Sequence, residues 1–361
     1  MMRAFDRKLV LENGREFYGW GFGAAVEAVG EAVFNTSMAG YQEILSDPAY
    51  ASQIVVMTYP LIGCYGVNDE DFESRLPAMG GMVVKEYNDE PSNFRYTKTL
   101  AEVMEEYGIP GISGVETRTL ARLLRDQGEM KAMLTAADTP LEQAVAKLKG
   151  TPLPTGLVER VSCKKRWYSR TSRHQYNVVA VDCGIMLGMV RSLNLKGCNV
   201  TVVPHTTTPE EVVSLCPDGL FLSGGPGAPQ EAAAVIQLVR ELWGKLPIFG
   251  VGLGCQIIAL AYGAQVEKMT HPHRGANLPV RCLQTGKLDI TGQNHAYAVT
   301  AESLAKTGLT LTHQCVLDGT VEGLAQETDW VQGVQFYPPN LRDGGQESLL
   351  DSFIQLMQRR M

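Results

Sequence analysis

The sequence predicts an α/β protein with two domains: a mixed α/β domain at the N-terminus and a C-terminal domain with a mainly parallel sheet flanked by helices. Two observations support this prediction. The 361 residues are enough for two domains at about 100 to 200 residues each. In the second half, short β-branched or apolar runs alternate with helical stretches, as in βαβ units. We place the N-terminal domain at residues 1–150, a linker at 151–175 and the C-terminal domain at 176–361.

The N-terminal domain combines short β-like runs with Gly, Pro and Asn turns. Its predicted strands are Lys8–Leu11, Ala32–Asn35, Gln53–Thr58 and Gly81–Lys85. A helix is predicted at Thr117–Arg125, where three leucines recur at helical spacing. Gly128 supplies a stop signal for this helix.

The linker and the C-terminal domain differ in pattern. The segment 151–175 has five basic side chains between residues 164 and 173 and little apolar periodicity, which is typical of a solvated linker. The clearest helix of the C-terminal domain is predicted at Gln230–Trp243. Ligands of parallel sheets bind where loops leave the C-terminal ends of strands, so we look for a site after Leu222 and Val251. The predicted strands are Val178–Asp182, Asn199–Val203, Gly219–Leu222 and Pro247–Val251.

Composition excludes several classes of partner. A net charge of −7 gives no electrostatic support for binding nucleic acid or an anionic membrane. No stretch approaches the roughly 20 apolar residues of a membrane span, and the N-terminus has no signal-peptide core, so we expect a cytoplasmic protein. The eight scattered cysteines form no CxxC pair and are expected to be reduced. His271 and His273 have no third ligand nearby in sequence, so we expect no metal site.

Two glycine-rich loops follow the candidate strands. The first, SGGPGAP at 223–229, offers backbone N–H groups that can hold a carboxylate or an oxyanion. The second, FGVGLGCQ at 249–256, joins a strand to a helix predicted at Gln256–Tyr262 and has the pattern of a nucleophile elbow. Gly252 stands at its apex, where a nucleophilic elbow has Ser or Cys. No G-x-G-x-x-G pattern is present, which disfavours a dinucleotide site.

With both loops in view, the chain resembles the small-subunit family of carbamoyl phosphate synthetase over essentially its whole length. In the N-terminal half the motifs are FNTSMAGYQEI (34–44), TYP (58–60) and GVETR (114–118). The C-terminal half is similar to class I glutamine amidotransferase domains. Its motifs are GPG (225–227), the elbow, RG (274–275), QNH (293–295), DGT (318–320) and QF (335–336). The resemblance implies an N-terminal small-subunit domain followed by a class I amidotransferase-like domain.

The resemblance also implies a chemistry that this sequence does not retain. In the family, an elbow cysteine attacks glutamine, a His and a Glu complete the triad, and ammonia passes to a large subunit that uses ATP and Mg. The carbamoyl phosphate supplies arginine and pyrimidine synthesis. The matching triad positions here are Gly252, Tyr337 and Pro339. These residues offer no nucleophile, no good base at neutral pH and no carboxylate, so no catalytic residue is intact and no cofactor is expected in this chain.

The glutamine-binding positions of the family are better preserved than its triad. By motif match they are Ser37, Gly225, Gly227, Leu253, Gln256, Asn294, Ala296 and Tyr297. Ala296-Tyr297 replaces the family's Gly-Phe. Gly225, Gly227 and Asn294 could equally persist as turn residues alone, so glutamine remains an open candidate ligand.

We therefore expect a glutaminase-deficient, structural or regulatory small subunit that forms a heterodimer with the large subunit of an ammonia-using synthetase. One alternative is a stand-alone glutamine-binding or scaffold protein. A second is an active glutaminase with Cys255 as a relocated nucleophile, since a helix N-terminus can lower the pKa of a thiol.

Overall fold

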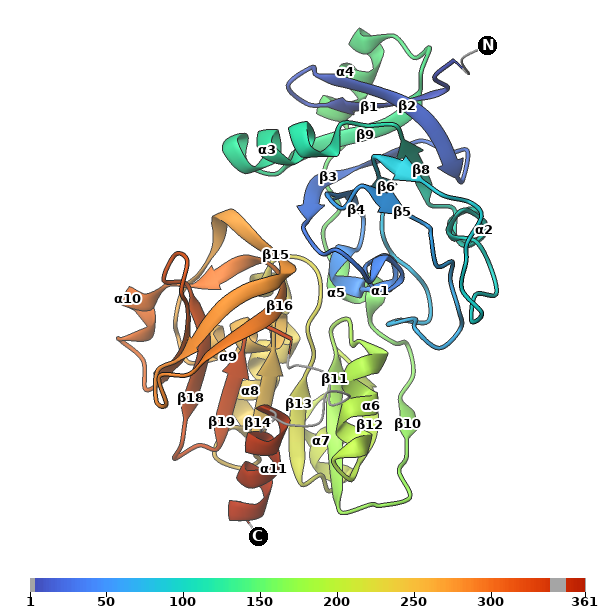
Figure 1. Ribbon diagram of the computed structural model, residues 1–361. Coiled ribbons are helices and arrows are strands. Elements are labelled where there is room, and N and C mark those ends of the chain that lie inside the picture. The colour runs from blue at the N-terminus through green and yellow to red at the C-terminus, as the bar shows by residue number, and fades with distance from the viewer. Residues whose placement is uncertain (1–3, 338–348, 361) are drawn as a thin grey trace. The chain divides into compact units, whose positions relative to one another are not determined.

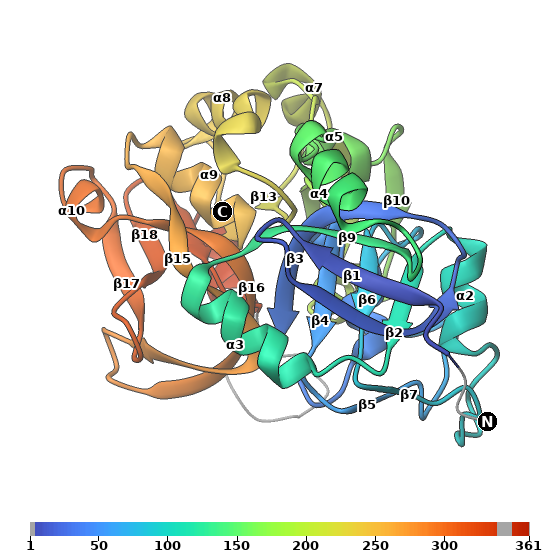
Figure 2. The same cartoon turned by 90° about the horizontal axis from the view of Figure 1, so that it is seen from above.

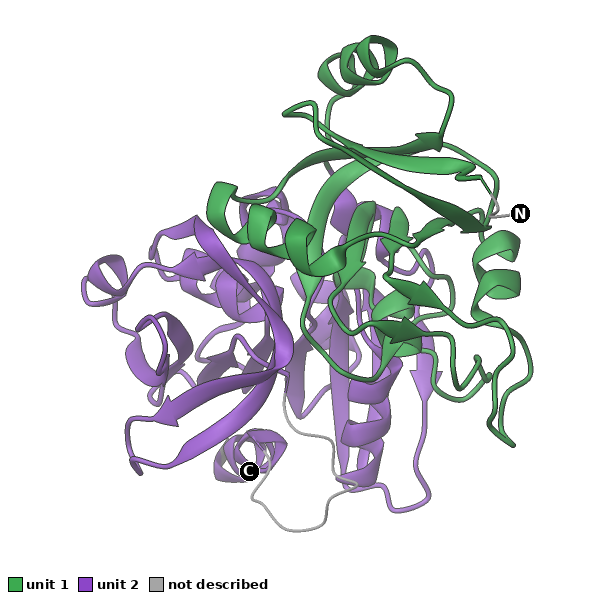
Figure 3. Ribbon diagram, turned by 45° about the horizontal axis from the view of Figure 1, so that its top comes forward, with its two compact units in different colours: residues 1–155 green, residues 156–361 purple. Residues whose placement is uncertain are grey.

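Residues 4–337 and 349–360 are described by a computed structural model, in which the chain forms two compact units (Figure 1, Figure 3). Unit 1 is Met1–Thr155 and unit 2 is Gly156–Met361. The segment expected to be a linker contains the helix α5 (Leu157–Val161) and the strand β10 (Trp167–Ser169). Val158 of α5 is buried in the core of unit 2, and β10 pairs with that unit's sheet. These contacts were not predicted, because the many basic side chains of the segment 151–175 indicated a solvated linker.

Unit 1 contains a closed barrel with the strand order β1-β2-β8-β6-β4-β3-β9. Antiparallel pairing of β1 with β9 closes it. The pairs β3–β4, β4–β6 and β6–β8 are parallel, and the other pairs are antiparallel. The barrel strands are β1 (Arg7–Leu11), β2 (Glu16–Gly23), β3 (Ala28–Asn35), β4 (Gln53–Met57), β6 (Gly81–Val83), β8 (Pro110–Ser113) and β9 (Met130–Ala136). A separate small sheet pairs β5 (Leu61–Ile62) with β7 (Glu86–Tyr87).

Four α-helices accompany the barrel: α1 (Tyr41–Ser46), α2 (Leu100–Glu106), α3 (Thr117–Gln127) and α4 (Leu141–Gly150). The helix predicted from its leucine spacing is confirmed as α3. Its leucines 120, 123 and 124 are buried with barrel residues such as Leu9 and Ile54. Gly128 follows α3 with φ 88°, a conformation that favours glycine.

Unit 2 is built on a ten-stranded sheet with the order β10-β12-β11-β13-β14-β19-β18-β17-β15-β16. Its five central strands are parallel: β12 (Cys198–Pro204), β11 (Tyr176–Asp182), β13 (Gly219–Leu222), β14 (Ile248–Val251) and β19 (Val331–Val334). Beyond β19 the sheet continues with antiparallel strands: β18 (Val321–Gln326), β17 (Thr310–Cys315), β15 (Val266–Cys282) and β16 (Leu288–Val299). This extension was not anticipated, because its strands carry many polar residues and bulges.

Helices cover both faces of the parallel strands, which confirms the α/β class (Figure 1, Figure 2). Along β11, Val179 and Val181 join the core that contains α7, α8 and α9, whereas Val178 and Ala180 join the core that contains α6 and α11. The helices are α6 (Leu187–Leu195), α7 (Pro209–Ser214), α8 (Ala233–Leu242), α9 (Leu253–Ala261), α10 (Ala301–Leu304) and α11 (Leu349–Arg360).

Two predicted helices differ at their starts. The helix expected at Gln230–Trp243 is divided into the 3-10 turn η2 (Pro229–Glu231) and α8, because Ala232 leaves the helical region with ψ 41°. The helix expected from Gln256 begins three residues earlier, as α9, directly after the elbow apex.

Candidate active site

The elbow lies between β14 and α9, at the C-terminal end of a central parallel strand. Gly252, its apex, is buried and has φ 54° and ψ −114°. Its N–H donates to the carbonyl of Val334 at 2.8 Å, and its carbonyl accepts the N–H of Gln256 at 3.2 Å. A Cβ at this position would lie 3.7 Å from Gly224 Cα and 3.8 Å from the Gln335 carbonyl oxygen, which are ordinary contacts. The elbow backbone therefore has room for a side chain that the sequence does not provide.

Tyr337 is the residue that the motif match predicts at the position of the family's catalytic histidine. Its backbone N–H donates to the Gly292 carbonyl at 2.9 Å, and its half-buried ring packs against the core of unit 2. The ring also lines a small cavity beside the elbow, together with Gly184, Met186, Met189, Gly224, Gly225 and Val251. This cavity has a volume of about 10 Å³, which corresponds to about one water molecule. Pro339 lies outside the described residues.

Two glycines of the first loop have structural reasons for being glycine. A Cβ on Gly225 would lie 2.0 Å from the carbonyl oxygen of Cys183 and 3.1 Å from Leu253 Cδ2. Gly227 has φ 85°, in the left-handed region. Ser223 fixes the start of the loop, because its hydroxyl accepts the N–H of Cys183 at 2.9 Å and donates to the Gly224 carbonyl at 2.8 Å. Neither glycine alone is evidence of a retained ligand.

The remaining predicted glutamine-binding residues of unit 2 lie on α9 and β16. Leu253 and Gln256 are buried in the first turns of α9, and the Gln256 amide donates to the Tyr297 carbonyl at 3.0 Å. Asn294 is half-buried on β16, where its side-chain oxygen accepts a short hydrogen bond from Arg274. Ala296 and Tyr297 follow it on the same strand and are also half-buried. The structure therefore places these predicted positions on the elbow helix α9 and on β16.

Comparison with known proteins identifies the family. Residues 9–134 match the family described as carbamoyl-phosphate synthase small chain, CPSase domain, and residues 179–356 match class-I glutamine amidotransferases. The carbamoyl phosphate synthase small chain of Fusobacterium nucleatum subsp. nucleatum is 48% identical over 358 residues, which cover 99% of each chain. This chain belongs to the carbamoyl phosphate synthase small-chain family. Two further members are similar: the small chain of Staphylococcus epidermidis is 47% identical over 97% of this chain and 96% of its own. The pyrimidine-specific small chain of Halalkalibacterium halodurans is 47% identical over 98% of this chain and 97% of its own.

The two regions matched in this small chain fall in different units. The CPSase region lies in unit 1 and the amidotransferase region in unit 2. Ser37, the one predicted glutamine-binding residue of unit 1, is half-buried after β3, and its N–H donates to the Asn35 side chain at 2.7 Å. Within the described part of the small chain, no helix has the length and apolar character needed to cross a bilayer.

Cys255 of the small chain points into the core. Its side chain is 0% exposed, and its Sγ would lie 3.0 Å from a Cβ placed on Gly333 of β19. Burial raises the pKa of this thiol far above its usual range. A relocated nucleophile needs an accessible thiolate, so both observations argue against that role for Cys255.

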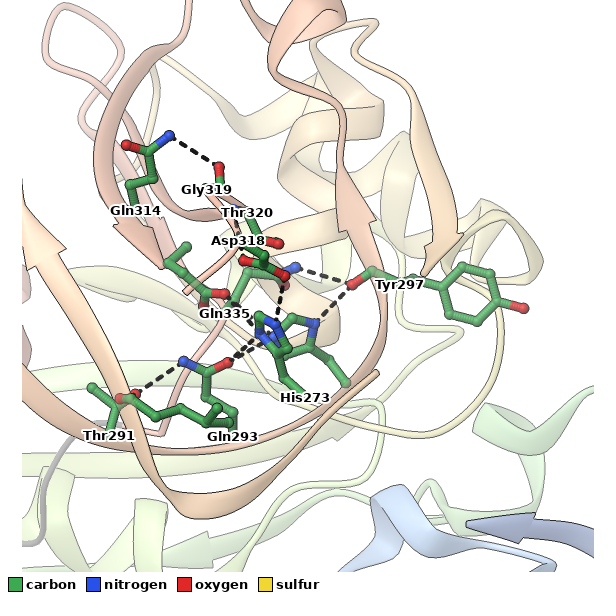
Figure 4. A network of polar contacts seen from close by, with 12 residues as sticks. His273, Thr291, Gln293, Tyr297, Gln314, Asp318, Gly319, Thr320 and Gln335 are labelled. Carbon is green, nitrogen blue, oxygen red and sulfur yellow. Dashed lines mark hydrogen bonds and ion pairs between the residues drawn. The ribbon is translucent and has the colours of Figure 1, made fainter. Parts of the chain in front are cut away.

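The small chain also has a network of buried polar side chains at the antiparallel strands of unit 2 (Figure 4). The sequence motifs did not predict that these side chains meet. His273 on β15 contacts Gln293 through Nδ1 at 2.8 Å and Asp318 through Nε2 at 2.9 Å. Its Nδ1 also lies 3.2 Å from Glu322 Oε1 on β18. His295 on β16 contacts Gln293 through Nε2 at 3.1 Å and the Tyr297 carbonyl through Nδ1 at 3.0 Å. The motifs around residues 293 and 318 were visible in the sequence, but no sequence signal pairs them with Glu322.

Electrostatics of this network favour charged side chains. Burial would lower the pKa of His273, but its contacts with Glu322 and Asp318 outweigh burial and raise it. Glu322 shows the opposite balance: burial would raise its pKa, and the neighbouring His295 and His273 lower it. The pKa of Asp318 is lowered to about 2, because hydrogen bonds from Thr320 and the charge of His273 outweigh burial. The network therefore stabilises carboxylates beside an imidazolium.

Gly252→Cys is expected to lower the free energy of unfolding of the small chain by about 1 to 2 kcal/mol. A non-glycine residue at this backbone conformation costs about 1 to 3 kcal/mol, and the smaller entropy of the unfolded variant recovers about 0.4 to 1 kcal/mol. Urea unfolding measures the difference. Gly292→Cys is the matched control, because Gly292 lies in the same unit, has no positive φ, and a Cβ there would lie 4.0 Å from the nearest described atom. A Gly252→Cys variant more stable than the natural chain would contradict this prediction.

Proposed function

We propose that this chain is a small subunit that does not hydrolyse glutamine and that serves as a structural or regulatory partner of a carbamoyl phosphate synthetase large subunit. The complex would take its nitrogen from ammonia, with ATP and Mg used by the large subunit. The proposal rests on the elbow apex. The backbone there has the conformation of a nucleophile elbow, but the residue is Gly252, which has no side chain. Its relatives are each named as a small chain, which supports a large subunit as the partner.

Each substitution removes a separate chemical requirement. Hydrolysis through a thioester needs a sulfur at the elbow, an imidazole that activates it, and a carboxylate that orients the imidazole. Gly252 has no side chain, and tyrosine has a reference pKa near 10 that makes it a poor base at neutral pH. His295 cannot substitute easily, because both of its ring nitrogens are already engaged, by Tyr297 and Gln293. Backbone N–H groups could still polarise a carbonyl, but they cannot form the covalent intermediate.

Of the predicted glutamine-binding residues, Gly225 is the one among those that line the cavity of about 10 Å³ beside the elbow, so the size of this cavity describes the elbow and not the predicted glutamine site. A stand-alone glutamine-binding or scaffold protein with no synthetase partner is a distinct second hypothesis. Co-purification with a large subunit would distinguish the two.

The test is a comparison of nitrogen sources in the assembled complex of this chain with its large subunit. We expect carbamoyl phosphate formation with ammonium, and a rate with glutamine lower by about a thousandfold or more, because losing the parts of a catalytic triad costs factors of this order or larger. Release of glutamate is measured in parallel.

Two controls make the result specific. A complex that contains a glutamine-hydrolysing small chain shows that the assay detects glutamine use, and Gly252→Cys alone should stay at background because it restores no base. Turnover with glutamine comparable to turnover with ammonium would refute the loss of glutaminase activity.

We also propose that the chain is cytoplasmic and that the carbamoyl phosphate supplies arginine or pyrimidine synthesis. One relative is named as pyrimidine-specific.

A further inference from the structure

Three neighbouring antiparallel strands of unit 2 bring together three side chains with metal-binding atoms. His273 lies on β15, Cys315 ends β17 and Glu322 lies on β18. One ligand atom from each lies within 4.8 Å of the other two, and all three residues are buried. None of them belongs to the elbow or to the predicted glutamine-binding positions.

The carboxylate of Glu322 has an unsatisfied oxygen. Its Oε1 contacts His273 at 3.2 Å and His295 at 3.6 Å, but its buried Oε2 has no hydrogen-bond partner among the described residues. Glu322 is 0% exposed, and an unpaired charged oxygen in a protein interior is costly. A bound cation would satisfy this oxygen directly.

Both histidines are oriented as metal ligands usually are. Metal-bound histidines generally donate their second ring N–H to a carboxylate or a backbone carbonyl. His273 Nε2 faces Asp318 Oδ2 at 2.9 Å (Figure 4). His295 Nδ1 faces the Tyr297 carbonyl at 3.0 Å. In each ring the other nitrogen is directed toward Glu322. The side-chain oxygen of Gln293 now lies between those two nitrogens, at 2.8 and 3.1 Å, and would have to turn aside.

We propose that His273, Cys315 and Glu322 form a binding site for a Zn²⁺ ion, with His295 as the candidate fourth ligand. Thiolate, imidazole and carboxylate together suit Zn²⁺ better than Mg²⁺ or Ca²⁺. Zn–N and Zn–S bonds of about 2.0 and 2.3 Å place tetrahedral ligand atoms about 3.3 to 3.7 Å apart. Atoms now within 4.8 Å of one another need to approach by up to about 1.1 to 1.5 Å. The ion would join β15, β17 and β18, so its role is structural.

The test uses the full-length chain, depleted of metal with a chelator and then titrated with Zn²⁺ alone. We expect one Zn²⁺ per chain and a rise in the melting temperature of unit 2 of about 5 to 10 °C at a hundredfold excess over Kd. Co²⁺ in place of Zn²⁺ should give a thiolate-to-metal charge-transfer band. Neither readout depends on glutaminase or synthetase activity, so the result is independent of the proposed function.

Cys315→Ser should abolish the Co²⁺ charge-transfer band and weaken Zn²⁺ binding by more than about a hundredfold, as expected for a lost ligand when outer-shell changes alone cost 10- to 100-fold. The exposed Cys216→Ser is the matched control and should change neither. His273→Gln should also weaken Zn²⁺ binding, and circular dichroism checks that each variant folds. Absence of stoichiometric Zn²⁺ binding, or equal binding by the natural chain and Cys315→Ser, would overturn the proposal.

Discussion

Glu322→Ala is expected to lower the free energy of unfolding of unit 2 by about 3 to 5 kcal/mol, the range for removing one partner of a buried ion pair. Its carboxylate is wholly buried and lies 3.2 Å from His273 Nδ1 and 3.6 Å from His295 Nε2. Without it, an imidazolium in the core loses its main partner, and neutral rings lose a hydrogen-bond acceptor. Urea unfolding gives the free energy, and hydrogen exchange of β15, β17 and β18 locates the loss.

The matched control for this prediction is Glu302→Ala. Glu302 pairs with Lys306 at 2.7 Å across one turn, but its side chain is 86% exposed. Exposed pairs of this kind contribute about 0.5 kcal/mol or less. Equal effects of the two substitutions would show that burial does not increase the contribution of Glu322 to the free energy of unfolding, and would contradict the prediction.

Gly225→Ala is expected to cost about 3 kcal/mol, the upper part of the usual range for overpacking. The added methyl group would lie 2.0 Å from the Cys183 carbonyl oxygen, and a backbone atom cannot rotate away as a flexible side chain can. The first loop would have to separate from the end of β11, and Leu253 at the start of α9 would also be displaced. Thermal and urea unfolding measure the cost.

Gly292→Ala serves as the control for Gly225→Ala, since among the described atoms its methyl group would meet only Tyr337 Cδ2, at 4.0 Å. We expect its effect to stay below about 0.5 kcal/mol, as for ordinary surface substitutions. A Gly225→Ala protein as stable as Gly292→Ala would mean that the loop moves freely. The close approach to Cys183 would then no longer explain the glycine.

Sequence patterns predicted the parallel half of unit 2 well. The strands β11, β12, β13 and β14 were expected within two residues of their observed ends, because apolar runs buried on both faces of a sheet contrast clearly with the turns between them. The helix α3 was predicted for a similar reason, since one apolar stripe packs against the barrel. Closure of the barrel was not predicted, because it depends on pairing β1 with β9, which are far apart in the chain.

The candidate site could also be predicted only in part from the sequence. The elbow could be found from a strand, three glycines and a helix that are contiguous in the chain, and the missing nucleophile could be named as Gly252. The environment of Cys255 could not be predicted, because its burial depends on Gly333 of β19 and on Glu322 of β18. No metal site was predicted from His271 and His273, since Cys315 and Glu322 lie more than forty residues from His273 in the sequence.

The sequence by itself determined which atoms are missing: residue identity alone shows that Gly252, Tyr337 and Pro339 supply no thiol, imidazole or carboxylate. It also determined the family, through contiguous motifs whose local backbone is specified by their own glycines and prolines. Only the tertiary structure decided which groups meet. The cavity of about 10 Å³ beside the elbow and the unsatisfied oxygen of Glu322 arise from packing between distant strands, and packing depends on distances in space that spacing along the chain does not encode.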